Sequence, residues 1–280
     1  MKTKTKTSSP TTNELKFKII ASDLDGTLLT PEHKIAPYTR DVLKRAHQQG
    51  ATIVIATGRH YVDVTGIRDR LGIPAYMITS NGARVHNPEG EIVFKQNVQP
   101  EDVKRVVEMT KSDTAIKTHL YRNDDWLLNK PSDNLNDFHE NFTYQLFDSN
   151  NPPSDGISKI FFIRDDMDHE RLVHWEQTFV ERLNGRAHVS FSTPWCLEIM
   201  DKGVSKGHAL EAIAKANGCE LKDCIAFGDG MNDVEMLKMA GKGLVMETSH
   251  EKVKRALPNN EILGPNSEES VARYLESHVI

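Results

Sequence analysis

Short apolar segments recur along the chain, and polar residues follow each of them directly. Four such segments are FKIIA (17–21), TIVIA (52–56), AYMI (75–78) and CIAF (224–227). Their length and their β-branched or aromatic content predict buried strands. The polar residues therefore stand at the points where these strands end.

Helical patterns separate the predicted strands. Pro37 suits the first position of a helix, and Val42 and Ala46 lie four residues apart on one face of it. A second amphipathic segment, 205–218, begins at Ser205, a residue type that is common at helix caps. Strands that alternate with helices predict an α/β fold with a doubly wound, Rossmann-like parallel sheet. Such folds bind ligands beyond the carboxyl ends of their strands.

The pattern changes between residues 84 and 200, where short strands such as KIFFI and HVSFS mix with helices and proline-bearing polar loops. We interpret this stretch as an inserted α+β module of roughly 115 residues, an ordinary size for a domain. The core domain is then discontinuous and consists of residues 17–83 and 201–280. Residues 1–16 are polar and basic, and we expect a disordered leader there.

Composition excludes several classes of protein. The 280 residues are 38% hydrophobic and 27% charged, and their net charge of -5 gives no general attraction for nucleic acid or anionic membranes. The cysteines, Cys196, Cys219 and Cys224, are too few and too irregular for a disulfide framework or a zinc knuckle. The basic N-terminus lacks the apolar stretch of a signal peptide or a membrane span. We expect a cytoplasmic protein, and the sequence indicates no protein partner.

Two aspartates, one residue apart, follow the first predicted strand. Asp23 and Asp25 stand in the segment SDLDGTLLT, directly before Gly26 and Thr27. Aspartate and glycine are common in turns, so a plain polar turn is one interpretation. The other is a ligand site, because two close carboxylates can hold different protonation states.

Four short motifs, taken in chain order, favour the ligand site. DLDGT (23–27), ATGR (56–59), GVSKG (203–207) and GDGMND (228–233) resemble the motifs of haloacid dehalogenase superfamily phosphatases. SNGA (80–83) and the long insert resemble the Cof-type subfamily, which carries a type IIB cap. The resemblance covers essentially all of the chain after the leader. It implies a phosphatase that hydrolyses small phosphorylated metabolites, such as pyridoxal phosphate and sugar phosphates, through an aspartyl-phosphate intermediate.

The resemblance also assigns catalytic roles. It makes Asp23 the nucleophile and Asp25 the acid and base, which protonates the leaving group and then activates water. Thr57 donates its hydroxyl to the phosphate in this scheme, and Lys206 pairs with both the phosphate and Asp23. Further substrate contacts are expected from Arg59, Asn81 and Asn232.

A magnesium ion is the cofactor that the resemblance implies. Its expected ligands are Asp23, the backbone carbonyl of Asp25, Asp229 and Asp233, with Asn232 in a supporting position. Magnesium suits such a site because it prefers oxygen ligands that leave room for water and a substrate phosphate.

Single members of this set also have ordinary explanations. Lysines in amphipathic helices are mostly solvated, so Lys206 alone is uninformative. Asn232 could cap the helix that follows it, and Asp233 could be a favourable acid in the first turn of that helix.

Two other functions stay open beside a phosphatase. A phosphomutase of the same superfamily keeps both aspartates. A phosphate-binding module could accept a phosphoryl group on an aspartate without turnover. Asp25 argues against a dehalogenase, which lacks the second acid, and against a transport ATPase, which has threonine there.

The inserted module is expected to close over the core as a lid and to select the substrate. Its hinges would lie near residues 82–84 and 200–203. Candidates for pairing with sugar hydroxyls are Arg122, Asp124 and Glu198. Candidates for an apolar wall against a pyridoxal ring are Tyr121, Trp126 and Trp195. The aromatic residues could equally be ordinary packing of the module.

One segment departs from the Cof-type pattern. Relatives often carry a Gly-Asn-Ala element after the last motif, whereas this chain reads GLVMETS over residues 243–249. Glu247 and Thr248 occupy that place, so the role of the usual asparagine is not carried over.

Overall fold

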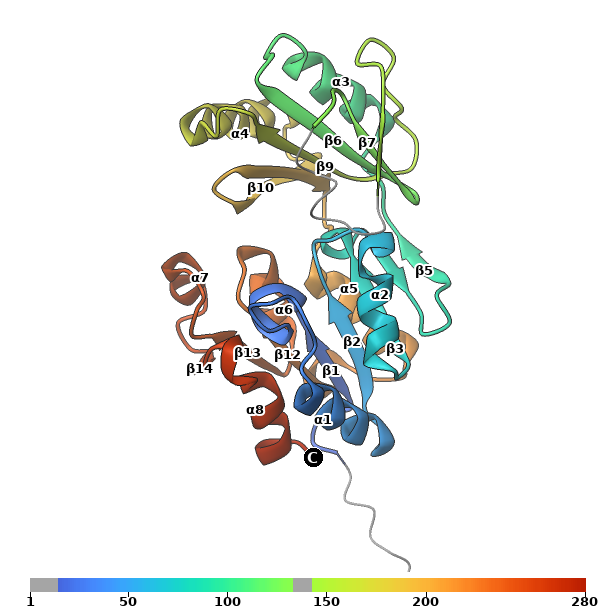
Figure 1. The fold of residues 1–280 in the computed structure, drawn as a ribbon, viewed down its shortest axis with the longest axis vertical. Coiled ribbons are helices and arrows are strands. Elements are labelled where there is room, and N and C mark those ends of the chain that lie inside the picture. The colour runs from blue at the N-terminus through green and yellow to red at the C-terminus, as the bar shows by residue number, and fades with distance from the viewer. Residues whose placement is uncertain (1–14, 133–142) are drawn as a thin grey trace, which may run out of the picture.

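The chain folds into two lobes, and each is built on its own sheet (Figure 1). The computed structural model describes residues 15–132 and 143–280. The core lobe contains both ends of the described chain, and the cap lobe is inserted within it. Residues 1–14 of the expected leader lie outside the described residues. Leu15 also belongs to the expected leader, but it packs against the core lobe.

The core sheet has eight strands in the order β14-β13-β12-β1-β2-β3-β4-β5. All neighbours from β14 to β3 pair in parallel, and β4 and β5 add an antiparallel edge. The bounds are β1 (Ile19–Ser22), β2 (Thr52–Ala56), β3 (Ala75–Thr79), β4 (Arg84–His86), β5 (Ile92–Lys95), β12 (Cys224–Gly228), β13 (Lys242–Met246) and β14 (Glu261–Leu263). The four apolar segments form β1, β2, β3 and β12, as their composition predicts.

Helices cover both faces of the core sheet, which confirms the doubly wound fold. One face packs against α1 (Pro37–Gln48), α2 (Tyr61–Leu71) and α8 (Ser270–His278). The other packs against α5 (Lys206–Ala216), α6 (Val234–Met239) and α7 (Glu251–Ala256). Within β1, Ile20 contributes to the first layer, whereas Ile19 and Ala21 contribute to the second, because side chains alternate along a strand.

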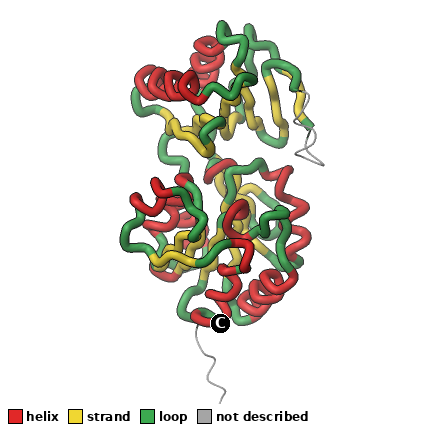
Figure 2. Tube along the Cα trace, turned by 60° about the vertical axis from the view of Figure 1, so that its left-hand side comes forward, coloured by secondary structure: helices red, strands yellow, loops and turns green. Residues whose placement is uncertain are grey.

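The cap sheet has six strands in the order β10-β11-β9-β6-β7-β8. Its bounds are β6 (Ile116–Arg122), β7 (Asp125–Leu128), β8 (Tyr144–Leu146), β9 (Ile157–Arg164), β10 (Ala187–Thr193) and β11 (Cys196–Asp201). The helices α3 (Pro100–Thr110) and α4 (His169–Leu183) cover one face. The other face is turned toward the core lobe (Figures 1 and 2). In the described parts of the chain, no helix is long and apolar enough to span a membrane.

The β4–β5 hairpin belongs to the core lobe, although the expected border at residue 84 assigns it to the cap. Arg84–His86 pairs with Met77–Thr79 of β3, so the hairpin extends the core sheet. Packing of the cap begins at Val98, which contributes to the apolar layer under α3. The chain therefore crosses between the lobes after β5 and after β11, and the first crossing lies beyond the expected hinge at 82–84. Local periodicity could not reveal this, because an edge hairpin is assigned by the strand with which it pairs.

Candidate active site

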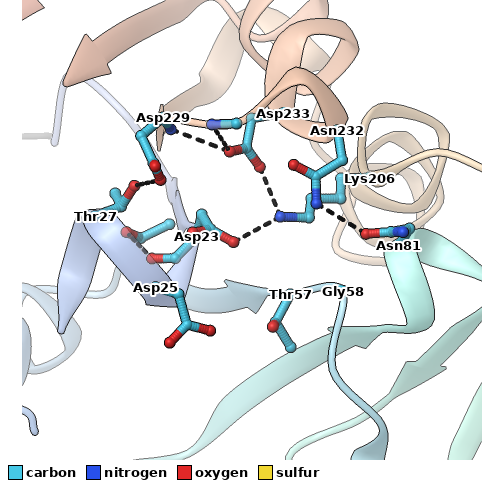
Figure 3. Close-up of polar contacts among 12 residues, drawn as sticks. Asp23, Asp25, Thr27, Thr57, Gly58, Asn81, Lys206, Asp229, Asn232 and Asp233 are labelled. Atoms are coloured by element: carbon cyan, nitrogen blue, oxygen red, sulfur yellow. Dashed lines mark hydrogen bonds and ion pairs between the residues drawn. The ribbon is translucent and has the colours of Figure 1, made fainter. Parts of the chain in front are cut away.

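The carboxyl ends of four neighbouring strands meet beneath the cap lobe. Because β12, β1, β2 and β3 are adjacent and parallel, the loops that follow them lie side by side. These loops hold the motif residues 229–233, 23–27, 57–59 and 80–82. Figure 3 shows their side chains around one centre, together with Lys206 from α5. The fold thus gathers the predicted residues at one edge of the sheet.

Three carboxylates form the centre of this edge. Oxygen atoms of Asp23, Asp229 and Asp233 lie within 4.8 Å of one another, and such an all-oxygen group could hold a hard cation such as magnesium. Burial raises the pKa of Asp23 well above its ordinary value, and the charges of Asp233 and Asp229 raise it further against the opposing effect of Lys206. Burial also raises the pKa of Asp229 to about 6. Crowding disfavours the charged forms of these acids, and the positive charge of Lys206 offsets part of this effect.

The loop after β1 approaches Asp229 closely. Gly26 has a φ of +78°, and a Cβ atom there would lie 2.5 Å from Asp229 Oδ2, so a larger residue would displace the carboxylate. Thr27 donates its hydroxyl to Asp229 Oδ1 at 2.7 Å and so orients the same group. Sequence reasoning gave Thr27 no role, although its place in the DLDGT motif was a usable signal.

Lys206 joins two of the three acids. Its Nζ atom donates to Asp23 Oδ1 at 2.6 Å and to Asp233 Oδ1 at 2.7 Å, and its side chain is 0% exposed. Burial lowers the pKa of Lys206, but the charges of the two aspartates outweigh burial and raise it above the ordinary value. Ser205 caps α5 by accepting a hydrogen bond from the backbone N–H of His208, which fixes the helix start and Lys206 with it. Lys206 is therefore buried and paired, and it is not a solvated lysine of an amphipathic helix.

Asp233 and Asn232 have partners beyond ordinary helix capping. Asp233 Oδ2 accepts hydrogen bonds from the backbone N–H groups of Asp229 and Gly230, while its other oxygen meets Lys206. Asn232 Nδ2 donates to Asn81 Oδ1 at 2.9 Å. Asp233 thus organises its own turn as well as the charged centre, and Asn232 links two motif loops.

Asp25 points away from the three carboxylates (Figure 3). Both of its oxygens accept hydrogen bonds from the Arg59 guanidinium, one of them at 2.7 Å, and His33 Nδ1 lies 3.1 Å from one oxygen. Burial alone would raise the pKa of Asp25, but the hydrogen bonds and charge of Arg59, with a contribution from His33, hold it below the ordinary value. The two aspartates therefore differ in protonation tendency, but Asp25 is the more acidic one here. A proton donor needs a raised pKa, whereas the pKa of Asp25 is lowered here.

Thr57 and Asn81 lie in the loops that follow β2 and β3. Thr57 is 1% exposed, and its Oγ1 accepts a hydrogen bond from the Arg59 backbone N–H at 3.1 Å, so its own hydroxyl proton can be donated elsewhere. The backbone N–H of Asn81 donates to the Thr57 carbonyl at 3.1 Å. Asn81 has a φ of +58°, an uncommon conformation for a residue other than glycine.

The cap places one of its predicted residues at the centre. Glu198 on β11 accepts a hydrogen bond from Asn81 Nδ2 at 2.6 Å. Tyr121 and Trp126 lie in the apolar layer on the core-facing side of the cap sheet, and Trp195 is 48% exposed in the turn between β10 and β11. The other two candidates, Arg122 and Asp124, lie at the turn between β6 and β7.

Lys159 on β9 is a site residue that sequence reasoning missed. Its Nζ atom donates to the Gly58 carbonyl at 2.7 Å and to Glu198 Oε1 at 3.0 Å. No local signal marks it, because KIFFI predicts a buried strand and its partner Glu198 is 39 residues away.

A cleft of about 500 Å³ lies between the lobes beside this centre. Asn81 and Asn232 line it from the motif loops, His188 lines it from β10, and Lys238 lines it from α6.

The segment that departs from the Cof-type pattern lies at the carboxyl end of β13. The side chain of Glu247 is exposed there, and its backbone N–H donates to the Leu263 carbonyl.

Comparisons with known proteins place the chain among hydrolases. The family model described as haloacid dehalogenase-like hydrolase matches residues 20–275. A Haemophilus influenzae protein described as a candidate phosphatase is 42% identical over 267 residues, which cover 94% of this chain and 97% of that protein. The HMP-PP phosphatase of Cronobacter sakazakii is 37% identical over 257 residues, which cover 91% of this chain and 93% of its own.

A solved structure shares the fold of this chain. A crystal structure from Thermotoga maritima superposes with a TM-score of 0.80 at 27% identity and covers 94% of this chain and 98% of its own. Its fold extends over both lobes, so the cap lobe as well as the core lobe has a counterpart.

Proposed function

Since the chain belongs to the haloacid dehalogenase-like hydrolase family and is a small-molecule phosphatase, we propose that it uses magnesium and an aspartyl-phosphate intermediate. The observation that carries this proposal is the buried bridge from Lys206 to Asp23 and Asp233. A lysine held there brings positive charge to the place where a phosphate dianion would meet the nucleophile. Charge stabilisation of this kind is the main requirement of phosphoryl transfer.

Two chemical steps follow from this arrangement. In the first, an Asp23 oxygen attacks phosphorus, the bond from phosphorus to the leaving oxygen breaks, and Asp25 gives that oxygen a proton. In the second, water attacks the phosphorus of the aspartyl phosphate, Asp25 takes up its proton, and Asp23 leaves as a carboxylate with inorganic phosphate as product. Thr57 and Lys206 stabilise the phosphate oxygens during both steps.

The proposed metal fits the acids that are present. Asp23, Asp229 and Asp233 would hold it with the backbone carbonyl of Asp25, and a bound divalent cation would neutralise charge on the transferring phosphoryl group. Thr27 orients Asp229 for this purpose, and the two backbone N–H groups beneath Asp233 fix the third acid.

Asp25 needs a change in its surroundings before it can act as an acid. The Arg59 pair stabilises its carboxylate form, which cannot donate a proton. We propose that a substrate phosphate, which carries negative charge of its own, competes for Arg59 and loosens this pair. Asp25 then regains a pKa that is set mainly by its partial burial.

The proposed substrates are small because the cap covers the phosphate side of the centre. Pyridoxal phosphate and hexose phosphates are our candidates, and HMP-PP, which the name of the Cronobacter relative specifies, joins them. We propose neither nucleic acid nor phosphoprotein as a substrate. We also propose no membrane partner and no protein partner. A cytoplasmic location would agree with the three free cysteines.

Phosphate release from an aryl phosphate, measured with magnesium and with chelator, tests the proposal. Steady release that depends on magnesium supports a phosphatase, and a single turnover per protein would indicate a phosphate-binding module instead. A sugar 1-phosphate separates the remaining alternative, because a mutase yields its isomer whereas a phosphatase yields inorganic phosphate.

A further inference from the structure

We propose that Lys159 and Glu198, here called the cap pair, are positioning residues that align the phosphate-side loops of the core when the cap is seated. This inference rests on the phosphatase activity proposed above. It assigns the cap a part in catalysis that does not depend on which leaving group it encloses.

The cap pair is buried at the boundary between the lobes. The side chains of Lys159 and Glu198 are each 6% exposed, and their charged atoms lie 3.0 Å apart. Lys159 Nζ also lies 5.1 Å from the ring centres of both Tyr121 and Phe161. Removing two charges from water is costly, and an apolar pair would suit this aromatic layer better if packing were its only purpose.

Each member of the pair reaches a different motif loop of the core. Lys159 donates to the carbonyl of Gly58, which stands between Thr57 and Arg59. Glu198 accepts from Asn81 Nδ2, and Asn81 in turn accepts from Asn232. One buried pair on the cap therefore holds the loops after β2 and β3, and through Asn232 it contacts the loop that carries Asp233.

The loop after β3 requires such support. Ser80 and Asn81 have φ angles of +48° and +58°, so two successive residues other than glycine hold a left-handed conformation. The Asn81 side chain is fixed by Glu198 from the cap and by Asn232 from the core. Glu198 is the charged partner that this turn receives from the cap, beside the weaker contacts of Met200 Sδ with Asn81 Nδ2 at 3.2 Å and of Ser158 Oγ with Ser80 Oγ at 3.4 Å.

Positioning explains the pair better than leaving-group recognition does. Lys159 uses two of its three N–H donors on Gly58 and Glu198, and the Glu198 oxygens accept hydrogen bonds from Lys159, Asn81 and the Cys196 thiol. Most of the hydrogen-bonding capacity of the pair is thus taken up by protein partners. A residue that reads the leaving group would instead keep its polar atoms for the ligand.

The experiment compares Lys159→Met with Arg164→Met. Arg164 lies on the same strand, and it pairs with Asp113 on the opposite face of the cap sheet, where Trp175 of α4 also meets Asp113. Both substitutions break a buried cap ion pair, so both disturb the cap lobe. Only Lys159 contacts the core.

Lys159→Met is expected to lower kcat roughly tenfold to a hundredfold on every substrate of a panel, with a smaller change in KM. Glu198→Gln, which keeps its shape and can still accept one hydrogen bond, is expected to lose less. Arg164→Met is expected to keep kcat within about twofold while its cap melts earlier. The double variant of the cap pair should lose less than the product of the single losses, because both residues act as one unit.

Three results would overturn the inference. Unchanged kcat in a folded Lys159→Met variant shows that the pair is only packing. A loss confined to some leaving groups shows that it reads the substrate. If the wild type releases no phosphate at all, the proposed function fails instead, and amide hydrogen exchange then decides about the pair. Peptides that cover residues 56–60 and 79–83 should exchange faster in Lys159→Met than in Arg164→Met, and equal exchange contradicts the inference.

Discussion

The two lobes face each other across one boundary, but they differ in the structural elements that they place there. The core lobe presents loops that follow parallel strands, and these loops place Asp23, Asp229 and Asp233 around Lys206. The cap lobe presents one face of a mostly antiparallel sheet, with an apolar and aromatic layer in which Lys159 and Glu198 form a buried pair.

This difference suggests separate tasks for the lobes, catalysis for the core lobe and substrate selection for the cap lobe. Loops at the carboxyl edge bring backbone N–H groups and carbonyls to the site as well as side chains, so they can stabilise crowded charges. A sheet face offers only side chains, and it suits exclusion of water and contact with a leaving group. The core should therefore determine whether a phosphate ester is cleaved, and most of the cap should determine which one.

Replacing the proposed nucleophile of the core lobe should have the largest effect on catalysis. Asp23→Asn keeps the shape of the side chain but removes the carboxylate, so kcat should fall by roughly 10⁴-fold or more on every substrate. The melting temperature should change little or rise, because burial and the charges of Asp233 and Asp229 disfavour the Asp23 carboxylate more than Lys206 favours it. Steady-state phosphate release measures the first quantity and circular dichroism the second. Full activity in this variant would contradict the assigned chemistry.

The metal centre is the next largest test. Asp229→Ala should mimic the chelated wild type, with a loss of roughly 10²- to 10³-fold at ordinary magnesium concentration. Added magnesium should recover part of the activity, and calcium should support the wild type poorly because its looser coordination does not suit in-line transfer. A magnesium titration of both proteins is the measurement. An unchanged half-saturating magnesium concentration in the variant would show that Asp229 is not a ligand.

The tryptophans of the cap lobe test which of its aromatic side chains stabilise the fold. Trp126 is 2% exposed and donates to His119, so Trp126→Ala should cost the cap about 3–5 kcal/mol of stability. Trp195 is 48% exposed in a turn, so Trp195→Ala should leave stability within about 0.5 kcal/mol. Thermal melts measure both effects.

The expected effect on selectivity is smaller than the effects on catalysis and on the stability of the Trp126→Ala variant. The ratio of kcat/KM for pyridoxal phosphate to that for a hexose phosphate should change by about tenfold at most in either tryptophan variant, the value of a modest apolar contact. If neither variant changes the ratio, the apolar wall is made by other residues.

The sequence predicted the strands and helices that carry the motif loops, because the signals for these elements are local. Thr52–Ala56 forms a strand over the range that its pattern indicates. Ser205 caps the helix that delivers Lys206, as its residue type predicts. Adjacent parallel strands then bring the motif loops together, since their carboxyl ends share one edge.

The rest depends on contacts between distant segments. The resemblance makes Asp25 the acid and base, but Arg59, which lies 34 residues away, holds its pKa below the ordinary value. Lys159 looks like part of an apolar strand until Glu198 and Gly58 are placed beside it. Pairings of this kind leave no periodic pattern, because the chain between the partners can have any length.

Rapid acid quenching of the reaction with an aryl phosphate tests the central claim most directly. This leaving group needs no proton, so Asp25→Asn should still transfer the phosphoryl group to Asp23 but should hydrolyse the intermediate slowly. Mass spectrometry of the quenched digest should find a phosphoryl group on the peptide that contains Asp23 in Asp25→Asn, and none in Asp23→Asn. Phosphorylation of another residue, or an Asp23→Asn variant that still turns over, would contradict the account.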